Sequence, residues 1–394
     1  MWWKKRVNLD YAAGVSGNPS SPHEEGRMAK QVLEEARTAL ARLTEVQSDD
    51  VIFTSGATES NALAILGHVH ALRLLAGRDT PGRNNMHVLY LPSAHASVVE
   101  NMKLLEEEGV EVEELPIHDA RVDTEALAKM LRKETVLVSM DAVCGETGVV
   151  WNTREVAGVL RKSRAECTEV RLPYQVRKSD FRSALLHVDA SQAPLTEKVS
   201  RAHFGADLLT FDASKVSTVR GIGALIAHRT IPLAPLYKGG GQERGLRSGS
   251  EAPELAREFA AALCAAARGR EAFRARAERE RAALVTRIRL IPNLLINEGR
   301  AQAPNILSIS LLGRDTDYLV ALLDEAGFAV STRSACETDS EEGSRAVFAL
   351  TSDRERARST LRIAWGAATH GRNLTRFSKA LARAVAFVDS SSLG

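Results

Sequence analysis

Short runs of β-forming residues alternate with helical patterns along the first half of the chain, and this alternation limits the fold more than any other feature. The β-rich runs span residues 51–55, 87–91, 110–115, 135–143, 185–188, 208–211 and 223–227. Ahead of the first run, within residues 23–46, Leu33, Ala36, Leu40 and Leu43 recur at steps of three and four, the spacing of one helix face. The pattern predicts an α/β fold with a seven-stranded, mostly parallel sheet covered by helices on both faces.

A change of pattern near residue 250 predicts a second, smaller α/β domain at the C-terminal end. The Gly-rich string Lys238-Gly-Gly-Gly-Gln-Glu-Arg-Gly245 gives way to an Ala/Arg/Glu-rich helix over about residues 254–287, followed by further strands and helices. A chain of 394 residues with 44% hydrophobic content is long enough for two cores. We expect residues 16–250 to form the large domain, and residues 1–15 with 251–394 to form the small one.

Charge and hydropathy favour a protein of the cytoplasm. The 52 basic and 50 acidic side chains leave a net charge of +2, so no overall field favours nucleic acid or an anionic membrane. The chain has no apolar stretch of membrane-spanning length, and its start, Met1-Trp-Trp-Lys-Lys-Arg6, lacks the apolar core of a signal peptide. Residues 161–182 carry seven Lys and Arg against three Asp and Glu, which predicts a solvated basic loop between a helix and a strand.

Two predicted strands end near an acid and an amine that could hold a cofactor. Asp189 closes the run from Ala184, and Lys215 ends the run that begins at Leu208. An amine can form a Schiff base with an aldehyde, and a carboxylate can keep a ring nitrogen protonated, so pyridoxal 5'-phosphate is the predicted cofactor. The alternative is that both residues are strand-end surface charges.

The run at 51–55 leads through a small-residue turn into an amphipathic helix. Gly56, Ala57 and Thr58 would place backbone N–H groups and a hydroxyl at the start of this helix, where a phosphate could bind. An ordinary helix cap is the alternative. Just past the next strand, His95 could stack on a planar cofactor and exchange protons near neutral pH, or be structural.

Two residues of the C-terminal part could act on a substrate. Cys336 lies in a polar segment and is the best candidate for a nucleophile among the four cysteines, whereas Cys264 falls in an Ala-rich helical run. The four cysteines form neither a disulfide framework nor a paired metal motif. Arg362 could hold a substrate carboxylate with its planar guanidinium, or form a surface ion pair.

The order and the residues of these motifs resemble those of the NifS/IscS-type cysteine desulfurases of the class V aminotransferase family. The matching motifs are Leu9-Asp-Tyr-Ala-Ala13, Gly17-Asn-Pro-Ser-Ser21, Thr54-Ser-Gly-Ala-Thr-Glu-Ser60, His187-Val-Asp-Ala190, Gly221-Ile-Gly-Ala-Leu225, Gly239-Gly-Gly-Gln-Glu-Arg-Gly-Leu-Arg-Ser-Gly249 and Ser334-Ala-Cys336. The resemblance covers nearly the whole chain and implies the fold type I of pyridoxal-phosphate transferases, with the cofactor on the large domain and the reactive cysteine on the small one.

The resemblance also implies a role for each matching residue. Lys215 corresponds to the lysine that binds the cofactor aldehyde, Asp189 to the partner of the ring nitrogen, Gln192 to the partner of the ring hydroxyl and His95 to the stacking acid/base. Ala57 and Thr58 match phosphate-loop positions. Ser250 stands where the family has a threonine that reaches the phosphate of the neighbouring subunit, which implies a homodimer. Cys336 matches the cysteine that takes the sulfur as a persulfide, and Arg362 the arginine that binds the substrate carboxylate.

Several matching positions carry a different residue from the family. The family's Ser-x-His before the lysine, which binds the phosphate, is replaced by Asp212 and Ser214. A carboxylate about 4 Å from a phosphate charge would cost about 4 kcal/mol at an effective dielectric constant of about 20, unless Arg220 or a turned-away rotamer relieves it. Gly145 replaces an amide that contacts the cofactor, Ala364 replaces a serine near Arg362, and the segment between residues 13 and 17 is shortened.

The resemblance implies an enzyme that removes sulfur from L-cysteine, leaving L-alanine and a persulfide on Cys336 for an acceptor protein in iron–sulfur cluster assembly or thiolation. The departures cluster at the site but retain Lys215, Asp189 and Arg362. The alternatives are another class V enzyme, such as an aminotransferase or a selenocysteine lyase, and a degenerate scaffold without activity. Nucleic acid and membrane are not expected partners.

Overall fold

The fold is described from a computed structural model of the chain. The structure describes residues 7–14, 17–76, 85–168, 184–332 and 343–391. Cys336 therefore lies outside the described residues.

A seven-stranded sheet forms the centre of the large part of the molecule, as predicted. Its strands run in the order β1-β9-β8-β7-β6-β2-β3. Their bounds are β1 Val51–Thr54, β2 His87–Tyr90, β3 Glu111–Glu114, β6 Thr135–Asp141, β7 Leu185–Asp189, β8 Leu208–Asp212 and β9 Gly223–Ala227. All neighbouring pairs are parallel except those of β9, which lies antiparallel between β1 and β8. The prediction of a mostly parallel sheet is confirmed.

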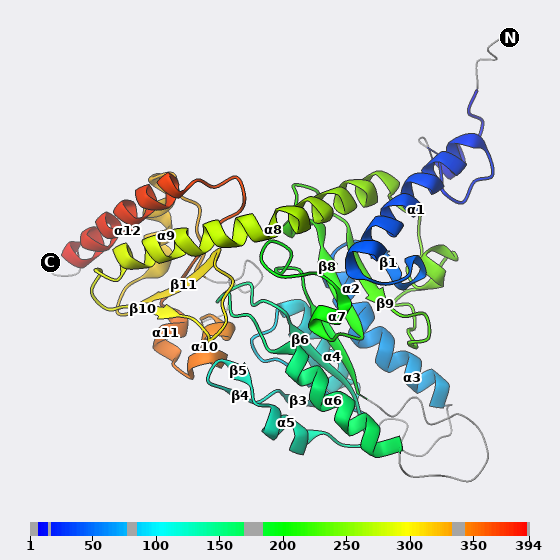
Figure 1. Cartoon of the computed structure of the whole chain (residues 1–394), viewed down its shortest axis with the longest axis horizontal. Coiled ribbons are helices and arrows are strands. Elements are labelled where there is room, and N and C mark those ends of the chain that lie inside the picture. Colours follow the sequence, from blue (N-terminus) through cyan, green and yellow to red (C-terminus); the bar gives the residue numbers. More distant parts are fainter. Residues whose placement is uncertain (1–6, 15–16, 77–84, 169–183, 333–342, 392–394) are drawn as a thin grey trace.

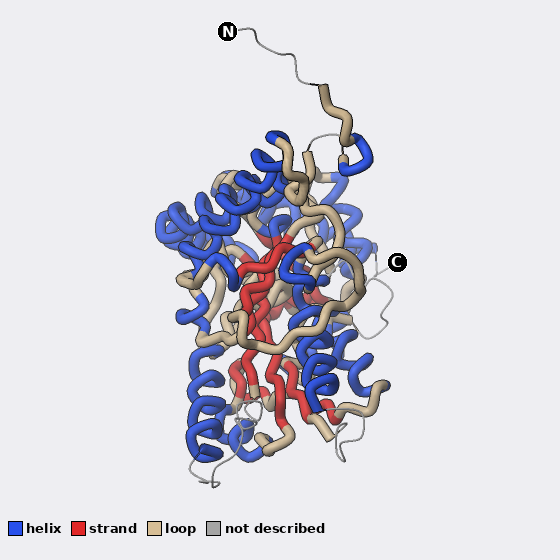
Figure 2. Tube along the Cα trace, turned by 90° about the vertical axis from the view of Figure 1, so that its right-hand side faces the viewer, coloured by secondary structure: helices blue, strands red, loops and turns tan. Residues whose placement is uncertain are grey.

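Helices cover both faces of this sheet, and Figure 2 shows the strands as a central layer between them. The helices of this part are α1 Glu24–Thr44, α2 Ala57–Ala62, α3 His68–Ala76, α4 Ala96–Glu107, α5 Thr124–Met130, α6 Thr153–Thr168 and α7 Arg201–Phe204, with the shorter turns η1 Tyr11–Ala13, η2 Ser48–Asp50, η5 Ala213–Lys215 and η6 Gln242–Gly245. The π-helical turn η3 Leu63–Gly67 joins α2 to α3, and a two-stranded ribbon pairs β4 Ile117–His118 with β5 Arg121–Val122.

The helix α1 lies where the apolar spacing predicts a helix. The prediction of a basic loop over residues 161–182 is wrong for its first part, because α6 continues to Thr168. The rest of that loop falls outside the described residues.

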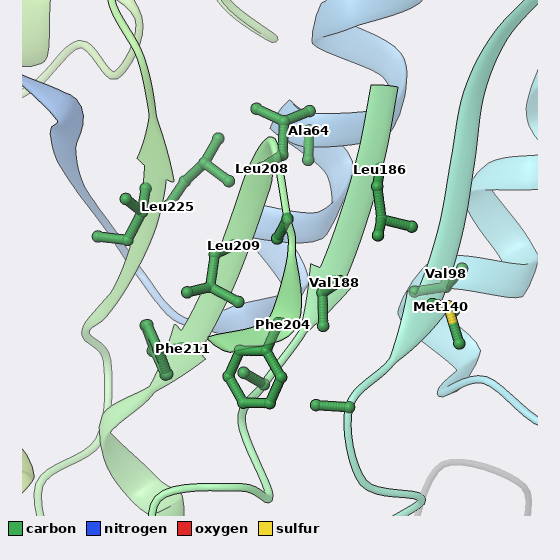
Figure 3. Close-up of a cluster of buried hydrophobic side chains, with 14 of the residues drawn as sticks. Ala64, Val98, Met140, Leu186, Val188, Phe204, Leu208, Leu209, Phe211 and Leu225 are labelled. Carbon is green, nitrogen blue, oxygen red and sulfur yellow. The ribbon is translucent and has the colours of Figure 1, made fainter. Parts of the chain in front are cut away.

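Two hydrophobic cores share one long helix. The larger core includes β7 and β8 side chains such as Val188 and Leu209, which Figure 3 shows packed with Phe204 and Phe211. The smaller core lies among β10 Leu294–Asn297, β11 Ile306–Leu311, β12 Thr360–Ala364, α9 Thr316–Glu325 and α12 Gly371–Ser391. The short helices α10 Arg345–Thr351 and α11 Arg354–Arg358 precede β12.

Helix α8, Pro253–Ile288, connects the two cores along its length. It packs against α1 near its start and against α12 near its end, as Figure 1 shows. Its first half contributes Phe259 and Leu263 to the larger core, and its second half contributes Phe273 and Leu284 to the smaller one. The division of the chain at residue 250 stays a prediction.

The register of the sheet places the ends of three strands beside one another. Gly223, the first residue of β9, pairs with Thr54 at the end of β1 and with Asp212 at the end of β8. A Cβ at Gly223 would lie 2.7 Å from the carbonyl carbon of Gly56, so only glycine lets these segments come this close. No described helix is long and apolar enough to cross a membrane.

Candidate functional site

The predicted site residues of the large part lie where the parallel strands β7 and β8 end. Asp189 is the last residue of β7, and Lys215 ends η5, which follows β8 directly. Polar groups collect at this edge because the carboxyl ends of parallel strands leave crevices above the sheet, where ligands of α/β proteins bind.

The carboxylate of Asp189 is buried and held at both oxygens. Its Oδ2 accepts a hydrogen bond from Asn61 Nδ2 at 2.7 Å, and its Oδ1 accepts one from the backbone N–H of Ser191 at 2.9 Å. The side chain is thus fixed by neighbours from α2 and from the turn after β7. A buried anion with a fixed orientation suits a partner for a protonated ring nitrogen.

A hydrogen-bonded chain connects Asp189 to His95. Asn61 Nδ2 also lies 2.9 Å from Ser97 Oγ, and Ser97 Oγ lies 2.8 Å from His95 Nδ1. The backbone N–H of Ser97 donates to the same Nδ1 at 3.1 Å, as His95 caps the start of α4. Because Nδ1 accepts this bond, a neutral imidazole carries its proton on Nε2. His95 itself is exposed.

A second carboxylate, Asp141, lies beside Asp189 in the sheet. The two residues pair in the register of β6 and β7, and Asp141 is 4% exposed. Burial, together with the charge of Asp189, raises the pKa of Asp141 well above its ordinary value. Asp141 Oδ1 has no hydrogen-bond partner among the described residues. Asp141 is therefore harder to ionise than an ordinary aspartate.

The predicted phosphate position is taken by a side chain of the protein. Asp212 Oδ2 accepts a hydrogen bond from the backbone N–H of Ala57 at 2.9 Å, at the start of α2. Its Oδ1 accepts from the N–H of Ser214 at 2.7 Å and from Ser214 Oγ at 2.6 Å. Gly56 adopts a φ of 151°, and Thr58 is exposed. The N–H of Ala57, which the sequence assigns to a phosphate, is thus bound by a carboxylate of the protein.

Lys215 and Ser250 are both exposed. Lys215 follows Asp212 by one short turn and has no hydrogen-bond or ion-pair partner among the residues that the structure describes. Ser250 lies in the loop between η6 and α8.

Contacts across Gly145 connect the two parts of the molecule. The Gln192 side chain lies against Gly145, where a Cβ would be 3.1 Å from Gln192 Nε2. From the smaller part, Arg362 Nη1 donates to the carbonyl oxygen of Gly145 at 3.3 Å. The missing side chain at Gly145 thus lets Gln192 lie close to the backbone that Arg362 contacts.

Residues on either side of the segment that carries Cys336 contact Arg362 and Glu146, which lie near Gly145 in the structure or in the sequence. Before it, Ser331 pairs with Arg362 in a β-bridge. After it, Ser344 Oγ donates to Glu146 Oε2 at 2.5 Å. Cys144, by contrast, is buried, and burial raises the pKa of its thiol to about 12, so it is not a nucleophile near neutral pH.

The site fits pyridoxal phosphate at one end and departs from it at the other. Asp189 and His95 lie where a ring could be held, and Lys215 is free to reach an aldehyde. The N–H of Ala57 that would bind the phosphate instead binds Asp212. The residues present therefore fit the ring of the cofactor, whereas its phosphate meets an existing negative charge.

Sequence reasoning missed Asn61, Ser97 and Asp141. Asn61 falls one turn into the helix whose start is the predicted phosphate position. Ser97 follows His95 without any pattern that indicates a function. Asp141 stands in an apolar run that predicts a core strand. A polar residue in such a run was the available signal for Asp141, since buried carboxylates are rare unless they are paired or functional.

Comparisons with known proteins show what the chain resembles. The aminotransferase class-V family model matches residues 6–168 and 174–376. The cysteine desulfurase IscS 1 of Archaeoglobus fulgidus is 33% identical over 362 residues, which cover 91% of this chain and 87% of that protein. The mitosomal cysteine desulfurase of Encephalitozoon cuniculi is 33% identical over 372 residues, covering 93% and 79%. A solved structure described as a NifS-like protein superposes with a TM-score of 0.81 at 26% identity over 97% of both chains.

Proposed function

Since this chain belongs to the aminotransferase class-V family, we propose that it is a pyridoxal-phosphate-dependent cysteine desulfurase, which converts L-cysteine to L-alanine and keeps the sulfur as a persulfide on Cys336. The observation that carries the proposal is that both parts of the molecule contact Gly145. Gln192, which follows β7 and Asp189 closely in sequence, lies against Gly145, and Arg362 of the smaller part donates to the Gly145 carbonyl oxygen. Arg362 also pairs with Ser331, which precedes the segment of Cys336 in sequence.

At the ring end, the chain's own residues hold protons in defined places. When bound, pyridoxal phosphate supplies an aldehyde that joins an amine and a ring that withdraws electrons from the substrate. Asp189, fixed by Asn61 and Ser191, would hold a proton at the ring nitrogen. The Nζ of Lys215 would take the α-proton of the substrate, and His95, whose Nδ1 is bound by Ser97, would stack on the ring.

At the substrate end, Arg362 binds the carboxylate of cysteine. Its Nη1 contacts a neutral carbonyl, Gly145 O, so its charge is not neutralised by that contact. A planar guanidinium binds a carboxylate through two parallel hydrogen bonds and fixes its orientation. Arg362 would thereby place the substrate sulfur on the side of the site from which the Cys336 segment starts.

The sulfur transfer balances without an added oxidant. The thiolate of Cys336 forms an S–S bond to the substrate sulfur while the C–S bond of cysteine breaks. The electron pair of that bond stays on carbon, which takes a proton and leaves as alanine. The product on the enzyme is a persulfide, which an acceptor thiol or protein then removes.

Dimer formation and the acceptor belong to the same proposal. Ser250 is exposed, which suits a residue that completes the site of a second copy. The sulfur acceptor is a protein of iron–sulfur cluster assembly or thiolation, and the enzyme acts in the cytoplasm.

Replacing Lys215 and Cys336 tests the proposal directly. Lys215→Ala should remove the visible absorption of the purified protein and reduce alanine formation from L-cysteine by at least about a thousandfold, because the amine acts in both binding and proton transfer. Cys336→Ser should keep the absorption and lose persulfide formation. Lys103→Ala, which removes a surface lysine paired with Glu100, is the matched control and should change neither.

Two results would contradict the proposal. A purified protein that stays colourless in excess pyridoxal phosphate is not an enzyme of this kind. Persulfide formation at the normal rate by the Cys336→Ser protein would show that another group accepts the sulfur.

A further inference from the structure

We propose that Asp212 competes with the phosphate of the cofactor for the N–H of Ala57, so that this chain discriminates poorly between pyridoxal phosphate and unphosphorylated pyridoxal. The inference rests on the proposed function in one respect: the site binds a pyridoxal aldehyde. It goes further by naming the residue that sets which form of the aldehyde the site retains.

Asp212 binds one N–H of the cradle, that of Ala57, without a ligand. One carboxylate oxygen binds Ala57 N at 2.9 Å, and the other binds both the N–H and the hydroxyl of Ser214. The N–H of Ala57 is one of the donors at the start of α2 that have no partner within the helix. Helix α2 continues through η3 into α3, so residues 57 to 76 form an unbroken run of helical residues. A negative group at this place is stabilised by both the N–H and the helix dipole.

Two glycines make this contact possible. Gly223 pairs with both Thr54 and Asp212 in the sheet, and a Cβ there would lie 2.8 Å from Gly56 Cα, so a larger residue would push the turn at Gly56 away. Gly56 precedes the bound N–H, and a Cβ there would lie 3.3 Å from Asp212 Oδ2. The carboxylate therefore sits directly against the turn that the phosphate would have to enter.

Nearby cations do not offset the charge of Asp212. Arg220 and Lys215 are exposed, and neither forms an ion pair with Asp212 in the described part of the chain. Arg247 lies 3.5 Å from Glu59 Oε1, in the first turn of α2, and is thus engaged by a second carboxylate. An incoming phosphate would either displace Asp212 from Ala57 N or share the cradle with its negative charge.

A capping role for Asp212 is the competing explanation, and it predicts a different outcome. Asp212 is the N-cap residue of η5, the turn that carries Lys215. If capping were its whole role, the charge would be irrelevant to the ligand, and its removal would affect both aldehydes alike. Asparagine keeps an oxygen that can accept the N–H of Ser214 but carries no charge.

Equilibrium dialysis of the full-length apo protein against each aldehyde distinguishes the two explanations. Asp212→Asn should raise the affinity for pyridoxal phosphate by about tenfold or more and change the affinity for pyridoxal by less than about threefold. The reason is that the substitution removes a charge that repels only the phosphate. Asp212→Ser, which restores a hydroxyl, should behave in the same way and serves if the asparagine variant folds poorly. Inorganic phosphate should raise the unfolding temperature of the apo variants but not that of the unaltered apo protein.

The matched control is Asp315→Asn. Asp315 is also an N-cap aspartate, accepting from the N–H groups of Asp317 and Tyr318, but it lies on α9 in the smaller part. Its replacement should leave both affinities unchanged.

The possible failures can be told apart. Equal tightening of both aldehydes, or no tightening of pyridoxal phosphate, would overturn the competition while leaving the proposed function in place. If the unaltered protein and the variants bound neither aldehyde, both the proposed function and this inference would be wrong.

Discussion

At the scale of single residues, Asn61 is the connection on which the ring end of the site depends. One amide nitrogen donates to Asp189 and contacts Ser97, which in turn binds His95. The two groups that flank the ring position are therefore oriented by the same side chain, which comes from a third element. Residues that orient functional groups in this way usually affect binding and activity nearly as much as the groups themselves.

Asn61→Leu should weaken the binding of pyridoxal phosphate and pyridoxal equally, by about tenfold, because a charge-assisted hydrogen bond of about 1.5–3 kcal/mol is lost on Asp189. Equilibrium dialysis of both aldehydes measures the effect. Asn152→Ala is the control, since it removes an amide bound to Val122 and Glu155 away from the site. Unequal weakening of the two aldehydes would place Asn61 at the phosphate end instead.

These residues also mark the limit of what the sequence could predict at this scale. Asp189 was predicted because it ends an apolar run, a local signal, and the structure places it at the end of β7. The contact of Asp212 with Ala57 spans 155 positions of the chain and depends on the antiparallel insertion of β9, which no local pattern encodes. The sequence shows that Asp212 differs from the family's residue, but it does not show which group the carboxylate of Asp212 contacts.

At the scale of elements, the turn η6 is pinned to the large sheet by a buried ion pair. Glu243 Oε1 accepts from Arg37 Nη2 at 2.6 Å, and Glu243 Oε2 accepts from the N–H of Phe53 at 2.9 Å. Glu243 and Arg244 both have positive φ, 46° and 62°. These contacts hold non-glycine residues in a disfavoured conformation just before Ser250.

Glu243→Gln should lower the free energy of unfolding of the apo protein by about 3 kcal/mol, because it removes the buried partner of the Arg37 charge and leaves only the half-exposed Glu34. Urea unfolding measures the change. Glu100→Gln, which breaks an exposed pair with Lys103, should cost less than about 1 kcal/mol. A similar small loss for both variants would show that the burial of Arg37 and Glu243 adds nothing to their interaction.

The elements themselves followed the sequence closely, with instructive exceptions. The seven predicted runs all form strands of the large sheet. The buried strands are largely apolar runs, whereas the edge strand β3 has three glutamates among its four residues. The antiparallel direction of β9 was not predicted, because direction depends on the connection and not on the pattern of one strand. The helix α6 extends into the basic stretch since charged residues are good helix formers on an exposed face.

At the scale of the whole molecule, one buried imidazole shapes the stability in acid. His187 lies between Ser139 Oγ at 2.8 Å and Thr210 Oγ1 at 3.0 Å. Burial lowers its pKa from 6.5 to about 4, against the opposing effect of the Asp189 charge. The unfolded chain therefore binds a proton in a range of pH where the folded protein does not.

Stability should accordingly fall as the pH drops from 6.5 towards 4, by up to about 3 kcal/mol from this group alone. His187→Gln should flatten that part of the profile, whatever its effect at pH 7.5. Urea unfolding at several pH values measures the slopes, and His228→Gln, at a partly exposed position, is the control. An unchanged slope in the His187→Gln protein would assign the acid sensitivity to other groups.

The shared helix α8 has a consequence for any attempt to divide this protein. A break in the chain near residue 250 would take Phe259 and Leu263 away from the larger core, although they follow the break in sequence. The fragment before the break would then expose an apolar strip along α1, where α8 lies in the intact chain. When the two pieces are expressed as separate polypeptides, each should be poorly soluble alone. They should associate when mixed, because α8 of the second piece then covers the apolar strip along α1 of the first.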